Sequence, residues 1–175
     1  KISGESMPEF PEVYTIVSDL KKILKDAVIE ETTVAKGYTA EPDNEEFVRQ
    51  TEKKQIKEVK QIAKNIIIEL EDTTIHIHLG MTGQVLAKKG PKTLPHEQVT
   101  FKIKSPDKTF YLVYRSVRKF GKVALMSPGE YQNLRKRHGI EPTSAELDLQ
   151  KFTALVRSKN TNIKNLLMEQ SKIGG

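Results

Sequence analysis

The chain contains no cysteine among its 175 residues. It can therefore form neither a disulfide nor a thiolate metal site, which fits a cytoplasmic protein. Without thiolates, zinc would depend on four scattered histidines, so we expect no metal site and no cofactor within this sequence. The sequence also lacks an apolar run long enough to cross a bilayer and the apolar segment of a signal peptide. We expect no membrane partner.

Acidic residues are outnumbered, because 23 Asp and Glu stand against 29 Lys and Arg, for a formal net charge of +6. The sequence pI of about 9.3 favours polyanionic partners, although many basic proteins bind no nucleic acid. A chain of this length can bury one core, or one domain and the start of a second. Charged residues at 30% and hydrophobic residues at 37% indicate a globular chain with a polar surface.

The hydrophobic pattern changes along the chain. Apolar residues at helical spacing predict an amphipathic helix over 11–27, and a short helix is expected over 44–50. Short apolar runs separated by turn signals predict strands over 28–34, 56–62, 65–70, 74–79, 83–87, 98–104, 109–114 and 121–126. Helical patterns follow over 129–137, 144–158 and 162–172. We predict an α+β fold, with an antiparallel β-sandwich and flanking helices over the first two-thirds and helices after it.

The segment Met7-Pro8-Glu9-Phe10-Pro11-Glu12-Val13 carries the clearest chemical signal. Methionine before proline is a start site whose methionine is readily removed, which would leave Pro8 with a free secondary amine. An α-amino group titrates at ~8, against ~10 for lysine, so part of it is an unprotonated nucleophile at neutral pH. Glu9 is a candidate proton donor and acceptor, and Glu12 lies in a first helical turn, where a carboxylate is favoured. Alternatively, the prolines merely end a loop and begin a helix.

This segment resembles the opening of the formamidopyrimidine-DNA glycosylase and endonuclease VIII family, whose mature N-terminal proline is the nucleophile. The run 62–70 is similar to the family's strand with a phosphate-gripping lysine, and Ile-His-Leu-Gly-Met-Thr-Gly at 77–83 matches a second motif. Arg-Lys-Phe-Gly at 118–121 matches a third, and His-Gly-Ile-Glu-Pro at 138–142 a weaker fourth. Their order and spacing agree along nearly the whole chain, which is more specific than any one motif.

The resemblance implies a base-excision repair glycosylase with AP lyase activity that removes oxidised purines, namely 8-oxoguanine and formamidopyrimidines. Such an enzyme flips the damaged nucleotide out of the duplex, and the amine of Pro8 attacks C1′ as the base leaves. Glu9 would transfer protons at the sugar, and Glu12 is grouped with these catalytic residues. The Schiff base would then decay by elimination with strand scission. The expected partner is damaged double-stranded DNA, bound by a cytoplasmic, nucleoid-associated monomer of bacterial type.

The resemblance also implies phosphate contacts by Lys64 and His78, and Lys164 matches a lysine that recurs before the family's next helix. From the residues alone, Lys64 reads as a solvated lysine at the edge of a sheet. A lone histidine in a strand, such as His78, is more often structural than a ligand. Both alternatives stay open at this point.

Three further residues are expected to enter the duplex. Met81, between two glycines in a hairpin, would fill the gap left by the extruded base. Arg118 would address the orphaned partner base and Phe120 would wedge a base step, although from the residues alone Phe120 reads as an ordinary core aromatic. The family usually has aspartate where this chain has Ser116, which leaves the hydrogen bonding of the Arg118 loop open.

We expect residues 1–6 to be an artificial remnant that would block Pro8, residues 7–127 a β-sandwich catalytic domain and residues 128–175 a partial helical DNA-binding domain. The family continues through a helix-two-turn-helix element into a cysteine zinc finger, so zinc is expected only in that missing part. Three alternatives remain: an inactive DNA-binding fragment or paralogue, an RNA-binding or ribosome-associated protein, and an endonuclease VIII-like enzyme for oxidised pyrimidines. Met81 with Arg118 and Phe120 favours the purine branch.

Overall fold

The computed structural model describes residues 8–157 and 162–174. The expected remnant over 1–6 and the expected start at Met7 lie outside the described residues, as do residues 158–161 and Gly175. Its helices are α1 (Phe10–Ile23), α2 (Asn44–Thr51), α3 (Pro128–Arg137), α4 (Leu149–Arg157) and α5 (Ile163–Met168). Its strands are β1 (Val28–Val34), β2 (Ile56–Ile62), β3 (Asn65–Leu70), β4 (Thr74–His78), β5 (Gln84–Lys88), β6 (Glu97–Lys104), β7 (Thr109–Arg115) and β8 (Lys122–Met126).

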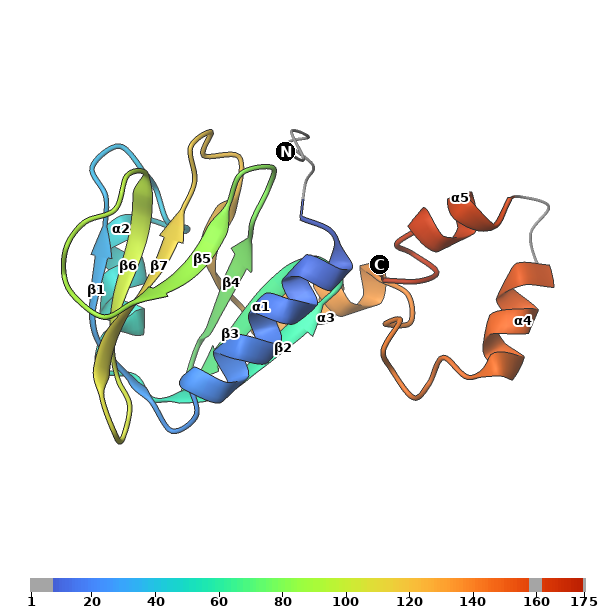
Figure 1. Ribbon diagram of the computed structural model, residues 1–175, viewed down its shortest axis with the longest axis horizontal. Helices are drawn as coiled ribbons and strands as arrows, with labels where there is room; N and C mark the ends of the chain where they lie inside the picture. The colour runs from blue at the N-terminus through green and yellow to red at the C-terminus, as the bar shows by residue number, and fades with distance from the viewer. Residues whose placement is uncertain (1–7, 158–161, 175) are drawn as a thin grey trace.

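The strands form two four-stranded sheets, in the orders β1-β6-β7-β5 and β2-β3-β4-β8. All neighbouring strands pair antiparallel. Helix α1 packs on β2 and β3, α2 packs on β1, and α4 and α5 lie apart from the sheets at the other end of the molecule (Figure 1). The predicted α+β fold, a β-sandwich with flanking helices followed by further helices, is confirmed. Among the described residues, no helix has the length and apolar character of a membrane span.

Strand β3 shows how the apolar pattern builds the core. Successive side chains of a strand point to opposite faces, so Ile66 and Ile68 enter the main core between the sheets. Ile67 points the other way, where Tyr131 and Leu134 of α3 cover it in a second, smaller cluster. The strand is therefore buried on both faces, and α3 closes the outer face of its sheet.

Helix α1 is shorter than the predicted helix over 11–27. It ends at Ile23, and Asp26 adopts a left-handed conformation with φ of 57°, which a helix cannot continue through. Leu24 and Ala27 are nevertheless fully buried. The apolar spacing therefore continued past the helix, because burial and not helical geometry keeps these positions apolar.

The predicted helix over 144–158 was wrong at its start. Helix α4 begins at Leu149, because the carboxylate of Asp148 accepts the backbone N–H of Lys151 at 2.7 Å and caps the helix there. Residues 144–148 form turns instead, one of them closed by the N–H of Leu147 donating to the carbonyl of Ser144 at 3.0 Å.

The predicted helix over 162–172 was wrong at its end. Helix α5 ends at Met168, and the backbone after it pairs with the segment around Gly139. The N–H of Gly139 donates to Gln170 at 2.8 Å, and the N–H of Ile140 donates to Lys172 at 3.0 Å. A Cβ at Gly139 would collide with the backbone of Lys172, so only glycine allows this close approach. The motif at 138–142 therefore joins the chain after α3 to the segment that follows α5.

Candidate functional site

The N-terminal end of α1 holds the segment that follows Pro8. The backbone N–H of Glu9 donates to the Glu12 carboxylate at 3.0 Å, so Glu12 closes the first turn of the helix. The helix dipole also favours a carboxylate at this position. The rings of Phe10 and Tyr14 stack one turn apart, with centroids 6.1 Å from each other. Pro8 itself is half-buried. Glu12 therefore fixes the backbone on which the predicted nucleophile sits.

Lys64 lies close to this end of α1. The Lys64 ammonium is 2.5 Å from the Glu9 carboxylate, and the Lys64 side chain is only 13% exposed. It occupies the two-residue turn between β2 and β3, where the preceding Ala63 has a φ of 50°. The alternative of a solvated lysine at a sheet edge is therefore wrong. The phosphate contact stays a prediction.

The two histidines of β4 have different environments. His76 is buried, its Nε2 lies 2.8 Å from the Asn65 side-chain oxygen, and burial lowers its pKa to about 4. His78 is half-buried, and burial lowers its pKa, with the positive charges of Lys64 and Lys122 lowering it further. His78 Nδ1 accepts the N–H of Gly80 at 3.2 Å. The neutral ring of His78 thus carries its hydrogen on Nε2, which suits a donor to an anion.

The loop after His78 packs against the loop between β7 and β8. A Cβ on Gly80 would lie 2.7 Å from the nitrogen of Gly121 and 2.8 Å from the carbonyl carbon of Phe120. A Cβ on Gly121 would lie 2.5 Å from the carbonyl oxygen of His78. Gly80 also has a φ of 62°, where residues with side chains are strained. These two glycines let the backbones touch, and Figure 1 shows both loops at the same end of the sandwich.

The contact brings Met81, Arg118 and Phe120 onto adjacent loops. Met81 is 38% exposed and Phe120 is 66% exposed, although both are large apolar side chains. The Arg118 side chain is exposed as well. The alternative that Phe120 is a core aromatic is therefore wrong. The two adjacent loops thus expose all three side chains, and their role with DNA stays a prediction.

Hydroxyl groups bridge the two loops, which the sequence did not reveal. Ser116 Oγ accepts the N–H of Lys119 at 3.1 Å, and Thr82 Oγ1 accepts the N–H of Arg118 at 3.3 Å. The two hydroxyl oxygens are 3.4 Å apart, although Thr82 and Ser116 are separated by 34 positions in the chain. The serine in place of the family's aspartate therefore makes a hydrogen bond within the Arg118 loop. No sequence signal relates it to Thr82.

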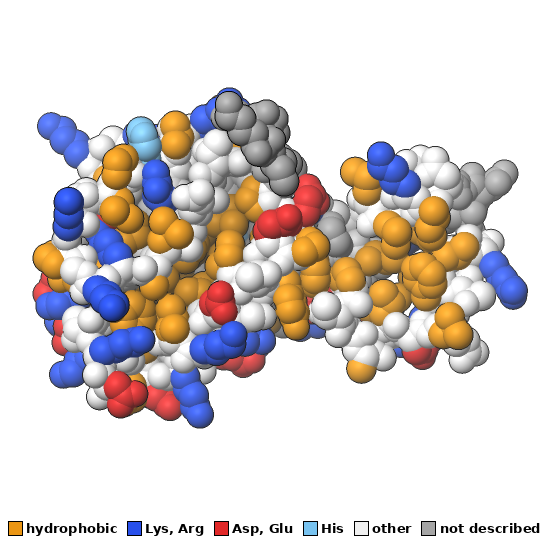
Figure 2. Space-filling model, in the orientation of Figure 1, with side chains coloured by type: hydrophobic (Ala, Val, Ile, Leu, Met, Phe, Trp, Pro, Cys, Tyr) orange, Lys and Arg blue, Asp and Glu red, His pale blue; other side chains and the backbone are white. Residues whose placement is uncertain are grey.

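Lys164 does not share this location. It is exposed in the first turn of α5, which begins where the Asn162 side chain accepts the N–H of Asn165 at 2.9 Å. Helices α4 and α5 lie away from the two loops (Figure 1), and apolar side chains gather on the surface of this end of the molecule (Figure 2). Leu149 and Met168 are among the exposed apolar residues. The structure therefore leaves Lys164 apart from the other predicted site residues.

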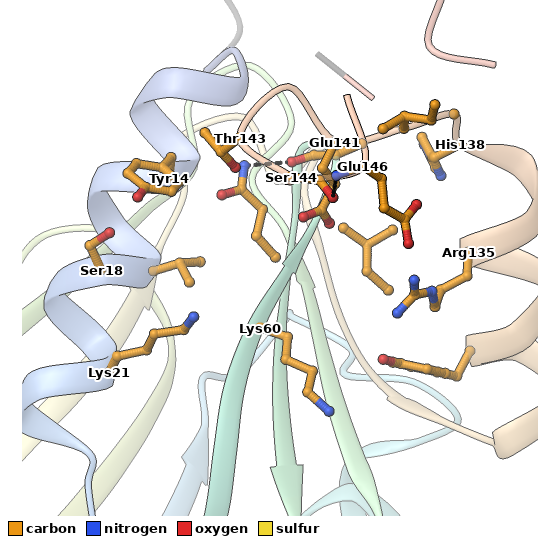
Figure 3. Close-up of a pocket in the computed structure, with 17 residues that line it drawn as sticks. Tyr14, Ser18, Lys21, Lys60, Arg135, His138, Glu141, Thr143, Ser144 and Glu146 are labelled. Carbon is orange, nitrogen blue, oxygen red and sulfur yellow. Dashed lines mark hydrogen bonds between the residues drawn. The ribbon is translucent and has the colours of Figure 1, made fainter. Parts of the chain in front are cut away.

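A groove of about 760 Å³ lies between α1, β2 and residues 131–146 (Figure 3). Cations of Lys21, Lys60 and Arg135 line it together with the carboxylates of Glu141 and Glu146. Burial raises the pKa of Glu141. None of the nine predicted site residues lines this groove, and its mixed charges do not suit a polyanion. The candidate site is therefore the group of residues that runs from Glu9 through Lys64 and His78 to the loops that carry Met81, Arg118 and Phe120. We call this group the ridge.

Comparison with known proteins gives relatives along nearly the whole chain. Residues 7–123 match the family described as Formamidopyrimidine-DNA glycosylase N-terminal domain. The formamidopyrimidine-DNA glycosylase of Lactobacillus acidophilus is 33% identical over 174 residues, covering 97% of this chain and 62% of that protein. The protein of the same name from Streptococcus pneumoniae is 30% identical over 173 residues, with the same coverage. This chain thus spans about three-fifths of these relatives' length.

Solved structures agree with these relatives. The Lactococcus lactis formamidopyrimidine-DNA glycosylase bound non-covalently to DNA with an AP site has a TM-score of 0.78 at 27% identity, covering 96% of this chain and 65% of that one. A structure of MutM with DNA containing carbocyclic 8-oxo-G has a TM-score of 0.76 at 27% identity, covering 95% and 62%. The Lactococcus lactis protein with an oxidised pyrimidine in DNA has a TM-score of 0.76 at 28% identity, with the same coverage.

Proposed function

Because the chain belongs to the formamidopyrimidine-DNA glycosylase family, we propose that the protein is a base-excision repair glycosylase with AP lyase activity. Its substrate is duplex DNA that carries an oxidised purine such as 8-oxoguanine or a formamidopyrimidine. The protein works as a cytoplasmic monomer, and any zinc is bound by residues outside this sequence. Relatives of solved structure hold damaged DNA, with an AP site in one and 8-oxo-G in another.

The observation that carries this proposal is the continuity of the ridge. The residue next to Pro8 is tied to Lys64 by an ion pair of 2.5 Å, and Lys64 lies near enough to His78 to lower the pKa of its imidazole. His78 in turn is the last residue of β4, directly before the loop that exposes Met81. A nucleophile, two phosphate donors and duplex-entering side chains therefore follow one another over a short stretch of surface.

The chemistry follows from the groups at the N-terminal end of this ridge. The Pro8 amine donates its lone pair to C1′, the bond between C1′ and the base breaks, and the base leaves with those electrons and takes up a proton. The Pro8 nitrogen loses its N–H proton. The sugar ring then opens to an iminium ion, and its ring oxygen takes a proton. Loss of a C2′ proton expels the 3′ phosphate and cleaves the strand. Glu9 transfers these protons, and its ion pair with Lys64 fixes where the carboxylate lies.

Duplex contacts come from the rest of the ridge. His78 donates from Nε2 to a phosphate beside the lesion, because its Nδ1 is already an acceptor for Gly80. Lys64 contacts a neighbouring phosphate. Met81 fills the space of the flipped nucleotide, while Arg118 and Phe120 act on the opposite strand.

Borohydride trapping tests the proposal. Protein whose chain begins at Pro8 should form a reduced covalent adduct with an 8-oxoguanine duplex, and acetylation of the Pro8 nitrogen should abolish it, because an amide nitrogen is not nucleophilic. Glu9→Gln should slow trapping while leaving duplex binding largely intact. Glu31→Gln is the matched control, because Glu31 is also an exposed carboxylate paired with a lysine, at 3.1 Å from Lys102.

Two outcomes contradict the proposal. Equal trapping with the blocked N-terminus would assign the nucleophile to another residue, such as a lysine. Binding of the lesion duplex without any adduct would indicate a DNA-binding protein without catalysis. A duplex containing an oxidised pyrimidine, tested in parallel, separates the purine specificity from that of an endonuclease VIII-like enzyme.

A further inference from the structure

We propose that Thr82 and Ser116 are positioning residues that join the Met81 loop to the loop carrying Arg118 and Phe120, and that Lys119 ties this second loop to the loop after β1. The hydroxyl groups and the lysine amine form a brace, so that the three exposed side chains enter the duplex as one unit. This inference rests on the proposed function, since the brace matters only if these loops enter DNA.

The hydroxyl pair satisfies backbone groups at the point where the loops meet. The N–H groups of Arg118 and Lys119 lie on the turn leading to Phe120, and each donates to a hydroxyl oxygen, at 3.3 Å and 3.1 Å. One oxygen belongs to Thr82, the neighbour of Met81. The backbone of the Arg118 loop is thus hydrogen-bonded directly to a side chain of the Met81 loop, and a shift of either loop would break this bond.

Ser116 anchors the brace to the sheet. Ser116 is 2% exposed, its N–H donates to the carbonyl of His96 at 3.0 Å, and its own carbonyl accepts from the Gln98 side chain at 2.9 Å. Its backbone is therefore held on both sides by residues at the start of β6. The hydroxyl projects from a fixed point, so a loop bonded to it is fixed as well.

Lys119 ties the loop that carries Arg118 and Phe120 to a third segment of the chain. Its φ is 54°, in the left-handed region that a lysine seldom adopts. The Lys119 ammonium donates to the carbonyl oxygen of Gly37 at 2.7 Å, on the loop after β1. The lysine within the Arg-Lys-Phe-Gly segment thus binds the protein's own backbone, whereas the side chains of its two neighbours, Arg118 and Phe120, are exposed.

The test compares Thr82→Val, which removes the hydroxyl and keeps the shape, with Thr82→Ser, which keeps the hydroxyl. Thr33→Val, at an exposed position of β1, is the control. Full-length wild-type protein and each variant are titrated with a duplex containing a tetrahydrofuran abasic analogue and with the undamaged duplex. A 2-aminopurine opposite the analogue reports, by its fluorescence, whether side chains have entered the stack.

Thr82→Val and Ser116→Ala should each lower the preference for the abasic duplex about fivefold, the effect of one lost hydrogen bond, and should reduce the 2-aminopurine signal. The double variant should lose less than the product of the single losses, because the two hydroxyl groups belong to one network. Thr82→Ser and Thr33→Val should behave as wild type. Melting temperatures, measured on the same samples, show whether any variant is unfolded.

The outcomes separate the brace from the proposed function. A wild-type protein without preference for the abasic duplex refutes the proposed function and the brace with it. A wild-type preference that Thr82→Val retains, or that Thr82→Ser loses equally, overturns the brace alone. If Ser116→Ala does not fold, the Thr82 pair decides, because Thr82 lies on the half-buried loop and not in the sheet.

Discussion

Replacement of Lys64 by alanine should weaken binding of damaged DNA in a salt-dependent way. The Lys64 side chain is 13% exposed and its ammonium lies 2.5 Å from Glu9, so its position is fixed and little of its surface is open to a phosphate. A lysine held in one place makes one phosphate contact. Removal of one such contact should reduce the log–log salt slope by about 0.9.

The expected change in the salt slope is large enough to measure by a binding titration. Between about 50 and 200 mM salt, a slope change of about 0.9 alters the ratio of wild-type to variant affinity roughly 3.5-fold. Fluorescence anisotropy with a duplex containing the tetrahydrofuran abasic analogue, at four salt concentrations, resolves such a change. Loss of the Glu9 partner is a separate consequence, and Glu9→Gln measured in the same series isolates it.

A matched lysine controls for net charge. Lys57 is also on the β2 side of the sheet and also faces a carboxylate, Glu71, at 3.8 Å, but it is half-exposed and outside the ridge. Lys57→Ala removes the same charge and should leave the slope close to wild type. An unchanged slope for Lys64→Ala, or an equal change for Lys57→Ala, would refute the phosphate contact and leave Lys64 as a partner of Glu9 alone.

Three further predictions concern stability and loop geometry. Burial lowers the pKa of His76 to about 4 from the ordinary 6.5, so between these pH values the unfolded chain binds a proton that the folded chain excludes. The free energy of unfolding should therefore fall by about 3 kcal/mol as the pH drops from 6.5 to 4. In urea titrations, His76→Gln should flatten this dependence of the unfolding free energy on pH. Gly121→Ala should cost about 1–3 kcal/mol and separate the loops, seen as a lower melting temperature with loss of abasic-site preference; wild-type values for both would contradict the backbone contact. Ile67→Ala should cost about 2–5 kcal/mol by opening a cavity under α3, whereas an effect below about 1 kcal/mol in urea unfolding would show that α3 does not seal this face.

The elements were predictable where local pattern and burial coincide. Strands over 56–62 and 65–70 agree with β2 and β3, because each is a short run rich in β-branched apolar residues and turn residues separate the two runs. The helix over 11–27 was predicted four residues too long, because Leu24 and Ala27 stay buried after the helix has ended. Periodicity reports which residues are buried, and it does not report where a backbone turns.

The sequence by itself determined the fold class, the family resemblance and the identities of the candidate residues, since these depend on local order and spacing. Only the tertiary structure decided which of them meet. The ion pair of Glu9 with Lys64 and the hydroxyl contact of Thr82 with Ser116 join segments far apart in the chain. Such contacts are set by how two sheets and a helix pack, and packing energy is spread over the whole core. No short stretch of sequence encodes it.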